Sequence, residues 1–74
     1  MTKDLKIVVD YCNENIVDFE ERVRMALDKI AFWKCSLQYA DANLCDEIAD
    51  AIAECAEDYG IDADNILEED VIWA

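Results

Sequence analysis

The chain has 74 residues, 55% of them hydrophobic, and 19 acidic side chains against six basic ones, for a net charge of −13. This length predicts one domain over residues 1–74, with far too much apolar content for a disordered chain. The shortage of Lys and Arg argues against direct binding to nucleic acid or to an anionic membrane, because both need basic side chains. The four cysteines lack metal-binding spacing and there is no His, so we expect free thiols, no metal or other cofactor, and a cytoplasmic location.

The first predicted element covers residues 5–12, LKIVVDYC. Its run of β-branched residues favours a strand, with Leu5, Ile7, Val9 and Tyr11 on one side. Read as a helix, the same segment would also align Leu5, Val8, Val9 and Cys12. We expect a strand, with a helix as the alternative.

A long helix is predicted over residues 16–39. Asn15 has the side chain of a helix N-cap, and acidic residues follow in the first turns, where the helix dipole favours negative charge. Apolar residues then recur at helical spacing on one face. This main stripe consists of Phe19, Val23, Ala26, Leu27, Ile30 and Leu37.

The opposite face of that helix would carry Met25, Phe32 and Tyr39. A helix that is apolar on two sides usually packs on both of them. This second face therefore has two interpretations. Either the terminal segments cover it, or it joins two copies of the chain in a homodimer.

A second long helix is predicted over residues 43–59. Asn43 is its expected N-cap, and Gly60, the only glycine, stands where a helix commonly ends with a positive φ. The connection to the preceding helix is short, so the two should form an antiparallel hairpin. The apolar stripe of this helix consists of Leu44, Ile48, Ile52, Cys55 and Tyr59.

After Gly60, the side chains of Asn65 and Glu68 indicate a short capped turn, and residues 70–73 could pair as a strand with residues 5–12. The predicted fold is therefore mainly α, an α+β arrangement with short terminal strands in β-α-α-β order around a helical hairpin. The alternative is an all-α small bundle.

The second long helix also carries an acidic face opposite its apolar stripe. Residues 35–74 contain no Lys or Arg at all. Like charges four residues apart destabilise a helix by about 0.2–0.5 kcal/mol per pair, and no base is interleaved to relieve them. The face consists of Asp46, Glu47, Asp50, Glu54, Glu57 and Asp58.

This acidic face can be read in two ways. One interpretation is a solubilising surface, since acidic side chains favour solubility. It can also be a binding surface, because evenly spaced carboxylates on a rigid rod imitate a row of phosphates. Such a row would occupy the basic groove of a nucleic-acid-binding protein, and charge complementarity would speed the association.

Other chemistry fits the sequence less well. Acid–base or cysteine catalysis requires a positioned partner such as His, and the chain contains no His. We therefore expect that the protein is not an enzyme. Asp62, Asp64 and Glu69 match a calcium loop only in part, with Ala63 where the loop needs glycine. Ser36 lacks the preceding Asp of the attachment motif of acyl carrier proteins.

In its small size, scarcity of bases and helical pattern, the chain resembles the small acidic proteins of phages and mobile elements, among them anti-restriction and anti-CRISPR proteins that mimic DNA. The resemblance is one of overall properties. It implies a non-enzymatic module that binds a basic protein, such as a nucleic-acid-binding enzyme, and inhibits it. The alternative is a structural or regulatory protein that homo-oligomerises through Met25, Phe32 and Tyr39, with acids that only solubilise it.

Overall fold

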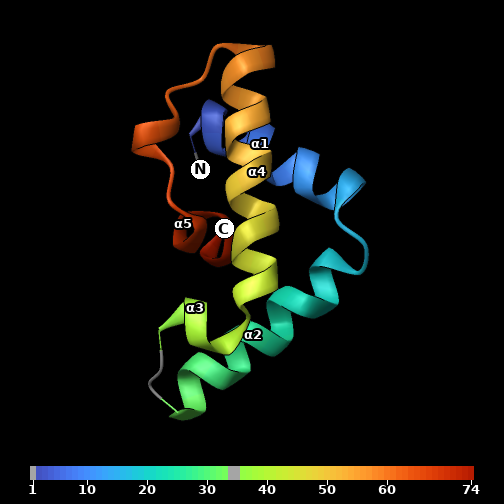
Figure 1. The fold of residues 1–74 in the computed structure, drawn as a ribbon, viewed down its shortest axis with the longest axis vertical. Helices are drawn as coiled ribbons and strands as arrows, with labels where there is room; N and C mark the ends of the chain where they lie inside the picture. Colours follow the sequence, from blue (N-terminus) through green and yellow to red (C-terminus); the bar gives the residue numbers. More distant parts are fainter. Residues whose placement is uncertain (1, 34–35) are drawn as a thin grey trace.

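The computed structural model describes residues 2–33 and 36–74, except for the side chains of Phe32 and Trp33. These residues form helices only, with no strand among them (Figure 1). The all-α bundle is therefore the correct fold class, and the β-α-α-β order is wrong. The elements are α1 (Lys3–Asn15), α2 (Phe19–Trp33), α3 (Leu37–Ala40), α4 (Ala42–Tyr59), the 3-10 turn η1 (Ala63–Asn65) and α5 (Glu68–Trp73).

Helix α4 runs along the long axis of the molecule, and α1 is its principal partner (Figure 1). The side chains of Leu44, Ile48 and Cys55 on α4 are completely buried, as are those of Val8 and Cys12 on α1. Helix α5 packs against both, whereas α2 contacts α4 much less. The hairpin predicted for residues 16–39 and 43–59 is therefore not the organising pair of the fold.

The predicted strand at residues 5–12 lies inside α1, which begins after Thr2. The Thr2 hydroxyl oxygen accepts a hydrogen bond from the Leu5 amide at 3.2 Å and so caps the helix. Val8 and Cys12, four residues apart, then face α4 together. Two isolated terminal strands would be marginal in water, whereas a helix satisfies its own backbone and buries one apolar stripe.

The predicted strand at residues 70–73 is also wrong, because these residues belong to α5. The amide of Leu67 donates to the Asp70 carboxylate at 3.2 Å at the start of this helix. Val71 and Ile72 are both buried. A strand would turn these neighbours to opposite faces, whereas a helix places both on one broad apolar face.

The helix predicted over residues 16–39 is divided. Asn15 is the last residue of α1 rather than an N-cap, and its side-chain amide donates to the Tyr11 carbonyl at 2.9 Å. The chain turns at Asp18, whose φ is +54°, and α2 follows. Helix α2 ends at Trp33, and α3 begins after Ser36, whose backbone is extended. Leu37, the first residue of this separate helix, is buried in the core.

The boundaries of α4 are close to those predicted. Its N-cap is Asp41 rather than Asn43, since the Asp41 carboxylate accepts from the Leu44 amide at 2.9 Å. Gly60 ends the helix with a φ of +69°, which confirms the prediction for this residue. The predicted stripe is buried from Leu44 to Cys55, but Tyr59 at its end is 61% exposed.

Replacement of Gly60 by Ala tests the cost of this positive φ. A Cβ atom at residue 60 would meet no other atom within 4 Å, so the effect should come from backbone strain alone. We expect Gly60→Ala to lower the free energy of unfolding by about 1 kcal/mol, measured by urea denaturation. Gly60→Asn should lower it less, because Asn tolerates this region better. Equal stability of Gly60→Ala and the parent would contradict the assignment.

Candidate functional site

The six acidic residues that the sequence predicts as a partner-binding surface all lie exposed on α4. Opposite them, Ile48, Ile52 and Cys55 are buried in the core. The helix is therefore held by its apolar side, and its carboxylates are presented at the intervals of a regular helix. We call this surface the acidic face; it consists of Asp46, Glu47, Asp50, Glu54, Glu57 and Asp58.

One edge of the acidic face is paired with neighbouring helices. The Tyr11 hydroxyl of α1 donates to the Glu54 carboxylate, and the Arg22 guanidinium of α2 forms an ion pair with Glu47. Arg22 also lies 3.8 Å from the Asp41 carboxylate. No base is interleaved within α4 itself, as the sequence indicates, but Arg22 from another helix supplies one at this edge. Local spacing could not show it, because Arg22 is distant in sequence.

The opposite edge of the acidic face remains open. At about 100° per residue, Asp46, Asp50 and Glu57 fall within about 40° of one another, and Glu47 and Glu54 fall within about 20° on the paired edge. Asp46 and Asp50 stand about 6 Å apart along the axis. These three carboxylates form no ion pair with another described residue. We call them the open row.

The ion pairs of Arg22 connect α2 to α4 and to its N-cap. The Arg22 side chain is only 25% exposed, so its charge is screened less than that of a fully solvated pair. We expect Arg22→Met to lower the free energy of unfolding by about 1 kcal/mol in low salt, measured by urea denaturation. Lys6→Met is the control. It removes the solvent-exposed Lys6–Asp10 ion pair at 2.7 Å and should lower the free energy of unfolding less than Arg22→Met does. Equal losses would contradict a special role for Arg22.

The described cysteines are poorly suited to nucleophilic chemistry. Cys12, Cys45 and Cys55 are free and buried, and Cys35 lies outside the described residues. Burial, with a smaller contribution from the nearby Cys55, raises the pKa of the Cys12 thiol from its ordinary 9.0 to about 12. Burial also raises the pKa values of Cys45 and Cys55, with acidic neighbours adding to the effect. All three are protonated at neutral pH.

The raised pKa of Cys12 predicts a loss of stability in alkali. Below pH 9 the thiol is protonated in both states and its contribution is fully present. Between about pH 9 and pH 12 the unfolded chain loses this proton while the folded chain keeps it, so the free energy of unfolding falls by about 1 kcal/mol per pH unit. Urea titrations from pH 8 to 11 should show a shallower decline for Cys12→Ala. Parallel curves would contradict the shift.

The described residues contain no cluster of three or more potential metal ligands. Within the partial calcium-loop match, Asp62 has a local role at η1. Its two carboxylate oxygens accept from the Asp64 amide at 3.1 Å and from the Asn65 side chain at 2.8 Å. In the part of the chain that is described, every helix is too short or too polar to cross a bilayer.

The residues of the predicted oligomer face are divided between two helices. Met25 lies on α2 and is 54% exposed, and Tyr39 lies on α3 and is 88% exposed. The backbone of Phe32 belongs to α2, and its side chain is outside the described part. Because α2 and α3 are separate, the helical periodicity that aligned the three residues does not apply. Their role in self-association remains a prediction.

Comparisons with known proteins give no relative from which a function could be transferred. No family model, no curated protein and no solved structure matches the chain.

Proposed function

We propose that this protein is a non-enzymatic cytoplasmic module that binds a basic protein through the acidic face of α4. In its sharpest form, the module occupies the Lys/Arg groove of a nucleic-acid-binding protein in place of the nucleic acid, as DNA-mimicking inhibitors do. The observation that carries the proposal is the open row. Asp46, Asp50 and Glu57 are exposed and aligned on one helix, and no described cation neutralises them.

The placement of α4 supports this proposal. The helix spans 18 residues and packs against α1, α3 and α5 through its buried stripe, so its backbone is ordered before any partner arrives. Binding then costs little further ordering of the backbone, which is the advantage of a preorganised surface. A surface that only solubilises the protein would gain nothing from this order.

The charge of the chain supports a basic partner. With a net charge of −13, the protein attracts cationic surfaces over long distances and accelerates encounter with them. The same charge repels a second copy, so homo-oligomerisation is the less favoured alternative. The exposed side chains of Met25 and Tyr39 are the observation in its favour.

Replacement of two members of the open row tests the proposal. We expect the parent, tagged and mixed with cytosolic lysate at low salt, to capture a basic nucleic-acid-binding protein identified by mass spectrometry. Asp46→Lys/Asp50→Lys should lose at least nine tenths of this protein. High salt should release it, because the Debye length falls from about 10 Å at 0.1 M to about 3 Å at 1 M.

A matched control separates the acidic face from net charge. Glu14→Lys/Asp64→Lys changes two exposed acids on α1 and η1 and alters the net charge equally. This variant should retain most of the captured protein. If both double variants capture equal amounts of the basic protein, or if only the tagged chain itself is recovered, the acidic face is not the binding site. Circular dichroism of both variants shows whether the helices remain intact.

A further inference from the structure

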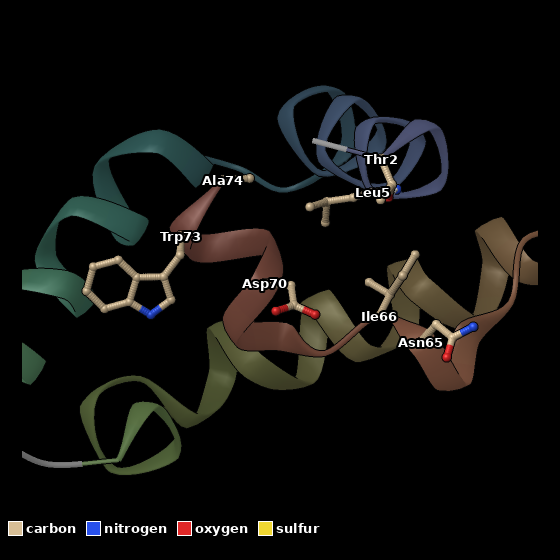
Figure 2. Close-up of a pocket in the computed structure, with 7 residues that line it drawn as sticks. All are labelled: Thr2, Leu5, Asn65, Ile66, Asp70, Trp73 and Ala74. Carbon is tan, nitrogen blue, oxygen red and sulfur yellow. Dashed lines mark hydrogen bonds between the residues drawn. The ribbon is translucent and has the colours of Figure 1, made fainter.

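A hollow of about 510 Å³ lies away from the acidic face, where the start of α1 meets α5 and the segment before it. Figure 2 shows Asp70 between Trp73 and Ile66, with Leu5 of α1 on another wall. This volume is within the range of protein pockets that hold ligands. The described residues lining it are Thr2, Leu5, Asn65, Ile66, Asp70, Trp73 and Ala74.

The walls of this hollow combine apolar surface, an aromatic ring and one negative charge. Leu5 and Ile66 supply aliphatic surface, and the indole of Trp73 is 64% exposed. One oxygen of the Asp70 carboxylate accepts from the Leu67 amide, which leaves its other oxygen for a ligand. The lining contains no basic residue, and residues 61–74 contain acids but no Lys or Arg.

A second hollow, of about 490 Å³, shares one lining residue, Ala74, with the first. Leu5 lines the first hollow and Val9, one helical turn later on α1, lines the second. Six of the eight residues that line the second hollow are apolar, among them Phe19 and Val71, and the other two are Asn13 and Glu20. Together the two hollows form what we call the α1–α5 groove.

We propose that the α1–α5 groove binds a segment of the basic partner that presents an arginine next to an apolar residue. The arginine enters the hollow beside Trp73, and the apolar side chain fills the hollow beside Val9. The inference rests on the proposed function in that both surfaces contact the same basic partner. It adds a second contact, on other helices, and this contact is selective for the type of side chain as well as for its charge.

Arginine suits this hollow for three reasons. Its methylene stem can cover Leu5 and Ile66 while its charged end remains at the rim. Its planar guanidinium can stack on the indole of Trp73, which attracts cations through its ring face. The same guanidinium can donate to the free oxygen of the Asp70 carboxylate. A second copy of this chain fits less well, because its charge of −13 would be repelled by the acidic lining residues Asp70 and Glu20.

A peptide titration tests the groove without the unidentified partner. The probe is acetyl-Gly-Leu-Arg-Leu-Gly-amide, added to the ¹⁵N-labelled full chain and followed by NMR. We expect saturable shifts of the Trp73 indole N–H and of the Leu5 and Ile66 amides. The same peptide with citrulline in place of arginine has the same shape but no charge. It should bind about two- to fivefold more weakly, the effect of one exposed ion pair.

Variants of the groove locate the contact. Asp70→Asn removes the charge and retains an oxygen that can accept from the Leu67 amide, so α5 keeps its cap. Asp70→Asn and Trp73→Ala should each weaken binding of the arginine peptide about two- to fivefold. Asp64→Asn is the matched control, because it removes an equal charge from η1, outside the lining, and should leave binding unchanged.

Three results would overturn the inference. The first is that the peptide shifts resonances of α4 alone. The second is that Asp64→Asn weakens peptide binding as much as Asp70→Asn does. The third is that the groove resonances depend on protein concentration and sedimentation shows a dimer, because a second copy would then be the occupant.

Failure of the proposed function is distinguishable from failure of this inference. If Asp46→Lys/Asp50→Lys still captures the basic partner while Trp73→Ala does not, the acidic face fails and the groove holds. Peptide shifts on α4 alone would refute the groove and leave the acidic face intact.

Discussion

The packing of α1 against α4 is the contact on which the rest of the structure depends. It buries Val8 and Cys12 against Leu44, Ile48 and Cys55, the largest fully buried side chains of the molecule's described part. A chain of this length buries only about 60% of its unfolded surface, so one good interface between helices has a large share in stability. Helices α2, α3 and α5 then complete the core around the two.

This packing also determines which face of α4 is exposed. Because its apolar stripe faces α1 and α5, its acids are exposed on the other side, at the spacing that the helix dictates. The neighbouring helices then modify this row. Tyr11 of α1 and Arg22 of α2 each contact one carboxylate of the paired edge, whereas the open row forms no ion pair with another described residue. Among the described residues, the acidic face is therefore partly neutralised along its paired edge and carries unpaired negative charge along the open row.

The sequence predicts α4 well because its signals are local. The apolar repeat from Leu44 to Cys55 and the glycine at residue 60 belong to one helix and need no tertiary information. The terminal segments were predicted wrongly for the opposite reason. Val8 and Cys12, or Val71 and Ile72, are compatible with either a strand or a helix, and only their packing partners decide between the two. The same limit applies to the site: exposure of the six acids follows from periodicity, whereas Arg22 reaches Glu47 only through the fold.

The uneven distribution of charge along the chain affects how the molecule is oriented as it approaches a charged surface. Every described Lys and Arg lies on α1 or α2, whereas α4, η1 and α5 carry acids alone. The centre of positive charge is therefore displaced from the centre of negative charge, and the molecule has an electric dipole moment as well as a net charge. In the field of a cationic surface such a molecule experiences a torque. It rotates during its approach, so α4, η1 and α5 lead, and α1 and α2, which carry the bases, trail.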